Sequence, residues 1–183
     1  MAVETQNKRI FYLDELDGLK VHHNDPDVRG WDVYTSDEKK IGEVENLVVD
    51  KKDKMVRYLD VHLDDSIMPE GSKPLDTKDS GSAGKVHEHM NEEGQRHMII
   101  PVGLVDIDKS SKNLNMKDYS FDSISGAPRY NRNEGFTQKY EVEVRDKFLP
   151  VKYNDKDASW NKNNNEDLGD DFYVEEYYTY KKS

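Results

Sequence analysis

Three histidines in a polar stretch are the residues with the clearest potential for metal chemistry. His87-Glu88-His89 places two imidazoles on one side of an extended segment, and His97 follows further along the chain. Imidazole and carboxylate ligands together suit zinc or nickel. However, the spacing differs from that of a helical metalloprotease motif, and the stretch has a loop-like composition without preformed ligand geometry. A metal site at His87, His89 and His97 is therefore an alternative interpretation, and we predict no cofactor.

Two charged residues, Arg57 and Asp60, stand in the clearest strand pattern of the chain, Met55 to Leu63. Because side chains alternate along a strand, they lie on opposite faces and cannot form a catalytic pair. A buried Arg57 needs a carboxylate partner, because an unpaired buried charge is costly, and Asp27 or Asp32 are the candidates. We therefore expect Arg57 to have a structural role.

The segment before the first strand pattern has the residues of a tight turn. In Asp25-Pro26-Asp27, followed by Arg29-Gly30, the carboxylates can accept hydrogen bonds from backbone amides and from Arg29. We interpret this turn as structural. No serine nucleophile elbow, phosphate-binding glycine loop or catalytic carboxylate pair is recognisable, and the sequence therefore predicts a protein that is not an enzyme.

The composition predicts a small core under a large solvated surface. The length of 183 residues suits one domain plus extensions, with 34% hydrophobic and 36% charged residues. A net charge of -11 repels nucleic acid and anionic membranes, and the absence of cysteine excludes disulfides and thiolate sites. With no apolar run long enough to span a membrane and no signal core, we expect a cytoplasmic protein without a membrane span or a nucleic-acid partner.

The apolar pattern indicates which elements position these residues. In the lead-in, residues 1–24, Ile10, Leu13 and Leu16 predict a short helical turn. From Trp31 the apolar period becomes two, as in strands, with a phase slip that indicates a bulge near Gly42. Further strands are expected at Met55–Leu63, at His97–Asp108 with a break around Pro101 and Gly103, and at Asn113–Met116. Together these strands predict a closed or nearly closed antiparallel barrel at residues 25–120, with a mobile insertion at 64–96.

The remaining third of the chain predicts one helix and a tail. Residues 121–150 indicate an irregular wrap and then a helix at Thr137–Phe148, with Tyr140, Val144 and Phe148 on one face. Residues 151–183 indicate a flexible, acidic linker that leads to a tyrosine-rich tail, which docks in cis or in trans. The partner-binding candidates in this tail are Phe172, Tyr173, Tyr177 and Tyr180.

Several motifs of the chain resemble the PRC-barrel superfamily, whose namesake is the cytoplasmic domain of the photosynthetic reaction centre H subunit. They are DPDVRGWDV at 25–33, KKIGEVENLVVD at 39–50, VRYLDVHL at 56–63 and HMIIPVGLVDID at 97–108. The likeness continues through YSFDSISGAPRY at 119–130 into the helix at 137–148. It implies a mainly β fold, built on a small antiparallel barrel with a C-terminal helix. It also implies structural roles for Asp25, Asp27, Arg29, Gly30, Gly42, Arg57, Pro101 and Gly103.

The resemblance implies less about function, because one fold serves many functions. The H subunit stabilises a membrane complex and helps proton delivery to a quinone, and Asp60 falls where that subunit has an acidic residue of its proton-delivery region. Asp60 is therefore a proton-relay candidate. The leading hypothesis is a non-enzymatic module for protein interaction or assembly, with a protein partner or self-association. The alternatives are an accessory protein of a membrane electron-transfer complex and a metal-binding protein.

Overall fold

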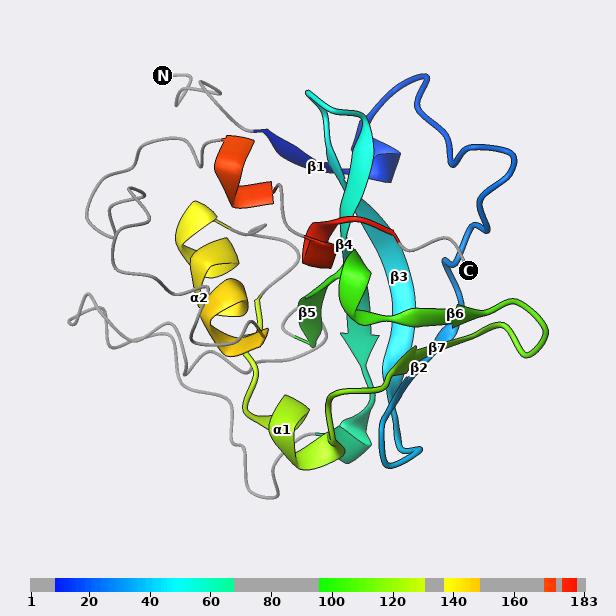
Figure 1. The fold of residues 1–183 in the computed structure, drawn as a ribbon, viewed down its shortest axis with the longest axis vertical. Coiled ribbons are helices and arrows are strands. Elements are labelled where there is room, and N and C mark those ends of the chain that lie inside the picture. The colour runs from blue at the N-terminus through cyan, green and yellow to red at the C-terminus, as the bar shows by residue number, and fades with distance from the viewer. Residues whose placement is uncertain (1–8, 68–95, 131–136, 149–169, 174–175, 181–183) are drawn as a thin grey trace.

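The computed structural model describes residues 9–67, 96–130, 137–148, 170–173 and 176–180 (Figure 1). One sheet of seven strands dominates this part of the chain, in the order β5-β4-β3-β2-β7-β6, with β1 paired to β3 outside that path. The strands are β1 (Ile10–Tyr12), β2 (Asp32–Thr35), β3 (Lys40–Asp50), β4 (Met55–Leu63), β5 (His97–Pro101), β6 (Asp106–Asp108) and β7 (Asn113–Met116). The prediction of a mainly β protein is therefore confirmed.

The long β3–β4 hairpin forms the centre of the sheet. Its register pairs Leu47 with Leu59 and Asp50 with Met55, and it shifts between Val44 and Asn46. The register between β2 and β3 also shifts, because it passes from Gly42 to Lys40 and skips Ile41, so the predicted bulge near Gly42 is confirmed. Gly42 has a further role, because a Cβ there would lie 2.1 Å from the carbonyl oxygen of His62. Only glycine allows the two strands to approach this closely.

The expected antiparallel barrel needs two corrections. The ladder between β2 and β7 is parallel, whereas the other pairs are antiparallel. In addition, no ladder joins the end strands β5 and β6 in the described part of the chain, so the sheet is strongly bent but open. The chain leaves β5 at Pro101 and turns through the 3-10 helix η4 (Val102–Leu104) before β6. The predicted break at Pro101 and Gly103 is confirmed by this turn.

The N-terminal lead-in differs from the predicted helical turn. Residues Ile10–Tyr12 form β1, which pairs with the end of β3, and only Leu13–Glu15 form a 3-10 helix, η1. The side chain of Arg9 reinforces this pairing through a 2.6 Å contact with Asp50. The apolar spacing of Ile10 and Leu13 reflects burial in both cases, but tertiary pairing decides the backbone conformation.

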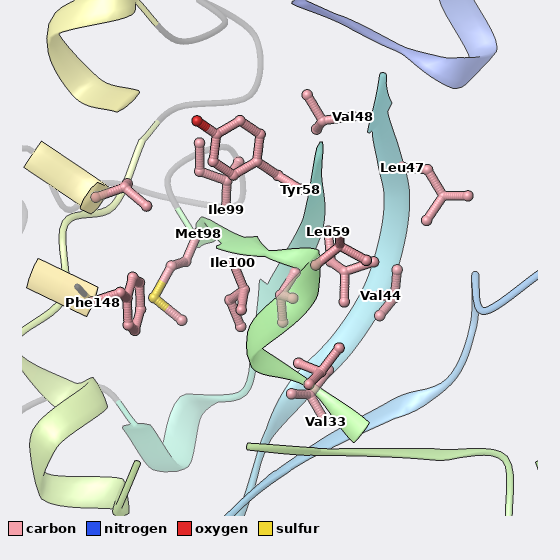
Figure 2. Packing of buried hydrophobic residues seen from close by; sticks show 14 of the residues in the cluster. Val33, Val44, Leu47, Val48, Tyr58, Leu59, Met98, Ile99, Ile100 and Phe148 are labelled. Carbon is pink, nitrogen blue, oxygen red and sulfur yellow. The ribbon is translucent and has the colours of Figure 1, made fainter. Parts of the chain in front are cut away.

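The described part of the chain has two α-helices, and one of them, α2, packs on a face of the sheet (Figure 2). The two helices are α1 (Phe121–Ser125) and α2 (Gln138–Phe148), and a further 3-10 helix, η2, covers Asp65–Ile67. The apolar face of α2 that the spacing predicts is buried, with Tyr140, Val144 and Phe148 at most 3% exposed. Figure 2 shows Phe148 facing Met98 and the sheet. Leu47 points to the opposite side of the sheet, away from α2.

The C-terminal segment, defined here as residues 170–173 and 176–180, lies against the body of the fold. It forms two 3-10 helices, η6 (Asp170–Tyr173) and η7 (Glu176–Tyr178). In Figure 1, η6 lies beside α2 and η7 lies in front of β4, next to η4. Phe172, Tyr173 and Tyr178 are at most 2% exposed. These tail residues therefore belong to the core of the chain that carries them.

Candidate functional site

Arg57 is buried at the centre of the contacts that hold the C-terminal segment. Its guanidinium lies 2.6 Å from Asp53 and 3.5 Å from Asp50. The same guanidinium donates hydrogen bonds to the backbone carbonyls of Tyr173 and Tyr178, at 3.3 and 3.2 Å. Arg57 thus joins the β3–β4 hairpin to both 3-10 helices of the segment.

The prediction that Asp27 or Asp32 pairs with Arg57 is therefore wrong. Asp27 pairs with Arg29, and Asp32 pairs with Lys40. The true partners lie within the same hairpin, because Asp50 ends β3 and stands diagonally across from Arg57, while Asp53 precedes it by four residues in the turn.

Gly103 provides the second contact with the C-terminal segment. A Cβ at this position would lie 2.1 Å from the carbonyl oxygen of Glu176 and 2.7 Å from the backbone of Tyr177. Side chains essentially never approach a backbone this closely, so η7 can pack on η4 only because residue 103 is glycine. The resemblance implies a structural role for Gly103, and the structure places it where the segment docks.

A buried carboxylate on α2, Glu141, completes this docking site. Its Oε2 accepts hydrogen bonds from the hydroxyls of Tyr173, at 2.6 Å, and Tyr58, at 2.9 Å. Burial raises the pKa of Glu141 to about 7, although both hydroxyl hydrogen bonds favour the charged form. We define the docking site as Arg57, Tyr58, Gly103 and Glu141.

Aromatic and cationic side chains surround the docked segment. Tyr178 packs edge-on against Tyr58, with ring centroids 5.5 Å apart. The guanidinium of Arg9 lies 4.7 Å from the ring centroid of Tyr173, within the range of a cation–π contact. Although burial favours the neutral form of Asp50, hydrogen bonds from Arg9 hold the pKa of this carboxyl below its usual value. The segment is thus held by directional contacts as well as by apolar burial.

A second buried network surrounds Asp60, the proton-relay candidate. Its Oδ1 accepts a 2.6 Å hydrogen bond from the Tyr130 hydroxyl and lies 2.9 Å from Nδ1 of His97. Tyr12 in turn donates to the Tyr130 hydroxyl at 2.9 Å. On its other side, Nε2 of His97 lies 3.4 Å from a carboxylate oxygen of Glu45, whose side chain is 42% exposed. We call Asp60, His97, Tyr130 and Tyr12 the Asp60 network.

The structure thus brings together Asp60 and His97, which the sequence assigns to different candidate sites. The other predicted metal ligands, His87 and His89, lie outside the described residues. Among the residues that the structure describes, no three histidine, aspartate or glutamate side chains are arranged to hold a metal ion. His97 instead pairs with Tyr130 across a backbone bridge and belongs to the core.

The turn before β2 contains the remaining residues with predicted structural roles. Asp27 accepts hydrogen bonds from the backbone amide and the guanidinium of Arg29, and the Arg29 side chain lowers the pKa of Asp27. The amide of Asp25 donates to the carbonyl of His22, and the amide of Gly30 donates to the carbonyl of Val44. This turn fixes the entry into β2, away from the docking site and the Asp60 network.

An apolar groove lies beside the end of the C-terminal segment. Its volume is about 730 Å³, and its walls come from residues 13–28, the β3–β4 hairpin, η4, β6 and the last described residues of the segment. Leu47, which lines the groove, points away from α2 (Figure 2). Of the tail candidates, Tyr180 lines the groove and is partly exposed, and Tyr177 is also partly exposed.

Sequence reasoning missed the residues that connect distant parts of the chain. The sequence analysis did not single out Glu141. The only signal for its burial was its position next to Tyr140, on the predicted apolar face of the helix. Tyr130 gave no signal in an irregular segment. The local pair Asp53 and Arg57 could have been predicted, since the two residues are only four positions apart in a tight hairpin.

A family model matches part of the chain. Residues 20–71 match the family model of the PRC-barrel domain, and this range contains β2, β3 and β4 together with Arg57 and Asp60. No curated protein matches the chain. None of the helices in the described part of the chain has the length and apolar character that a membrane crossing requires.

Proposed function

We propose that this chain, which carries a PRC-barrel domain, is a non-enzymatic protein-interaction module that assembles through its C-terminal segment. The observation that carries this proposal is the way in which the segment is bound. Arg57 holds the carbonyls of Tyr173 and Tyr178, Glu141 accepts from the Tyr173 hydroxyl, and Gly103 admits the backbone of η7. Such contacts recognise a peptide segment, as a receptor recognises a ligand.

The partner that fits this docking site is the same segment of a second copy. The connection between Phe148 and Asp170 comprises residues 149–169, and at about 3.3 Å per residue it can span tens of ångströms. When two copies exchange the same segment, each contact that the segment makes within one chain forms between the two chains instead. The exchange therefore needs no new surface. Docking within one chain is favoured at low concentration, because the tether raises the effective concentration of the segment.

The proposal that the protein is not an enzyme is supported by where its reactive side chains lie. Asp60 and His97 are at most 3% exposed, and both belong to the core of the sheet. The groove, whose walls include neither residue, is mainly apolar. A general acid or base must reach a proton on its substrate, and these two buried residues have almost no surface that a substrate could touch.

Segment exchange can be tested with two full-length variants that complement each other. Gly103→Val blocks the docking site of one copy, and Tyr178→Ala removes the fully buried ring from the segment of the other. Each variant alone should sediment as a monomer. An equimolar mixture should form a 1:1 dimer, because the intact segment of the first variant docks on the intact site of the second.

The control is a chain that carries both substitutions. The double variant has neither an intact docking site nor an intact segment. Its mixture with Gly103→Val should therefore remain monomeric, because no chain in that mixture has an intact docking site. If the mixture of the two single variants also stays monomeric at concentrations of hundreds of micromolar, the segment docks only within its own chain and the proposal is wrong.

A second candidate function, an accessory protein of a membrane electron-transfer complex, is favoured by the Asp60 network. Contacts of 2.6 to 3.4 Å join Tyr130 to Asp60, Asp60 to His97, and His97 to the exposed Glu45. A chain of this kind can carry a proton between the core and the surface. Asp60→Asn should then slow proton uptake by a co-fractionating membrane complex. Unchanged uptake, or absence of the protein from membranes, would exclude this function.

A further inference from the structure

We propose that the apolar groove binds a straight-chain aliphatic carboxylate, a small amphiphile with an apolar body and one anionic end. None of the four docking-site residues lines this groove, although Tyr180 of the C-terminal segment does. An exchanged segment would make the same contacts, so the ligand would bind whether or not segments exchange between copies. Four features of the groove carry the proposal: its volume, its apolar walls, its exposed methionine and the charges at its rim.

The volume fits a small molecule. Binding sites for small molecules typically measure about 300–1,000 Å³, and the groove measures about 730 Å³. By contrast, a stable protein partner would need a broad interface of more than about 1,000 Å², for which a single concave groove of this size is not suited. The groove therefore suits a small molecule that it can enclose better than it suits a protein partner.

The walls are those of a site for an aliphatic chain. Leu19, Val21, Val56 and Ile107 line the groove, and each is only partly buried although each is apolar. Partly exposed apolar side chains that face one hollow are covered when an apolar ligand enters, which is the main source of binding free energy for such ligands.

Met55 adds to this apolar surface. It is 38% exposed and is the only large hydrophobic side chain classed as exposed among the residues that the structure describes. Because a methionine side chain is unbranched and flexible, it adapts to chains of different shape, and it recurs at surfaces that bind apolar ligands. Its place at the groove is therefore consistent with a ligand that covers it.

The rim carries positive charge in an otherwise acidic protein. Lys20 and Lys54 both line the groove, and neither has a carboxylate partner in the described part of the chain. His22 also lies there, and its Nδ1 accepts from the amide of Asn24, so the neutral ring keeps its proton on Nε2 and can donate. Asp25 is the carboxylate on the same rim. Two cationic side chains and a neutral imidazole donor against one carboxylate select an anionic end group over a cationic one.

Calorimetric titration of the full-length protein with sodium dodecanoate, below its micelle concentration, tests the proposal directly. We expect saturable binding, and we expect dodecan-1-ol, which has the same chain without the charge, to bind about two- to five-fold more weakly. In the double variant Lys20→Gln/Lys54→Gln this preference for the carboxylate should disappear, because both cations that face it are gone.

Matched variants separate the groove from the rest of the surface. Lys112→Gln is the control for Lys54→Gln, because both lysines are exposed, stand in hairpin turns and have a φ of 55°. It should leave the dodecanoate affinity unchanged. Val56→Trp fills the groove and should weaken binding at least ten-fold, whereas Val142→Trp, at a partly buried valine on α2 outside the groove, should not.

A measurement on the unmodified protein covers the case in which a variant fails to fold. In methyl NMR spectra, dodecanoate should shift the signals of Leu19, Val21, Val56 and Ile107 more than those of core residues such as Val33. The proposal is overturned if dodecanoate gives no saturable binding, if Val56→Trp binds as the unmodified protein does, or if the shifted methyl groups lie elsewhere. Any of these results leaves the segment-exchange test unaffected.

Discussion

Asp60 and Glu141 are both buried carboxylates that accept hydrogen bonds from tyrosine hydroxyls, but their tyrosines come from different parts of the chain. Asp60 is held by His97, which belongs to strand β5, and by Tyr130, which belongs to the segment after α1. Glu141 is held by Tyr58 of β4 and by Tyr173 of the C-terminal segment.

This difference separates a structural network from a docking site. Opening the Asp60 network means separating β4, β5 and the segment around Tyr130, which is close to unfolding the domain. Opening the Glu141 contact requires only that the C-terminal segment leave. Local opening of this kind can occur with a free energy well below that of global unfolding. We therefore expect the Asp60 network to open only on global unfolding, and the contact between Glu141 and Tyr173 to open locally.

The largest expected effect on this contrast comes from Gly103→Val. Because a side chain at residue 103 would overlap the backbone of η7, docking of the segment should be lost completely. Hydrogen exchange should then show unprotected amides in residues 176–180, while β4 and β5 stay protected. Gly126→Val is the matched control, since a Cβ at Gly126 meets only the end of Lys147, at 3.6 Å. Equal loss of protection in both variants would contradict this prediction.

Arg57→Leu should have the next largest effect. Removal of one partner of a buried ion pair costs about 3–5 kcal/mol, and here two backbone carbonyls of the segment also lose their donor. Denaturant unfolding should show this loss, and the segment should become accessible to protease. Arg29→Leu breaks an exposed pair with Asp27 and should cost less than about 1 kcal/mol. A similar loss for both variants would mean that burial of Arg57 contributes nothing.

The raised pKa of Glu141 predicts a pH dependence that belongs to the docking site. Its pKa is about 7 in the folded protein against 4.5 for an ordinary glutamate, so the folded state favours the protonated form. The corresponding stability, about 3 kcal/mol, is complete below pH 4.5 and is lost as the pH rises through 7. Unfolding free energies measured from pH 4.5 to 8 should fall more for the unmodified protein than for Glu141→Gln. Parallel curves would contradict this assignment.

The smallest expected effects come from a matched pair of hydroxyl deletions. Tyr130→Phe and Tyr173→Phe each remove a hydrogen bond to a buried carboxylate, which is worth about 1.5–3 kcal/mol, and Tyr130→Phe also removes the acceptor of the Tyr12 hydroxyl. Tyr130→Phe should lower the stability of the whole sheet. Tyr173→Phe should increase hydrogen exchange in the C-terminal segment and leave β4 and β5 unchanged. If both variants change the same amides, the two networks form one cooperative unit.

The strands could be predicted from the sequence because their signals are local. Met55–Leu63 and Asn113–Met116 are strands with the predicted bounds, since alternating apolar residues between charged turns specify a strand wherever it packs. The helix from Gln138 to Phe148 begins one residue after the predicted position. By contrast, Ile10–Tyr12 is a strand where a helical turn was expected, because pairing with β3 outweighs a weak local preference.

The sites could be predicted only in part. The sequence identified Arg57 and Asp60 as unusual, since charged residues inside an apolar strand pattern need partners, and it identified His97 as a possible metal ligand. It did not identify those partners across long separations, because no local pattern connects Asp60 to Tyr130 or Glu141 to Tyr173. The tail tyrosines were expected at a partner surface, and the structure places Tyr173 in the core of its own chain.

The sequence by itself determined the strand pattern, the α2 helix and the polar residues that must find partners, because these follow from the spacing of apolar and charged side chains. The tertiary structure decided which partners meet. It placed the C-terminal segment on Arg57 and Gly103, and it set Asp60 against His97. The physical reason is that burial and hydrogen bonding between distant segments depend on how the sheet bends and on what packs against it, which residue spacing does not encode.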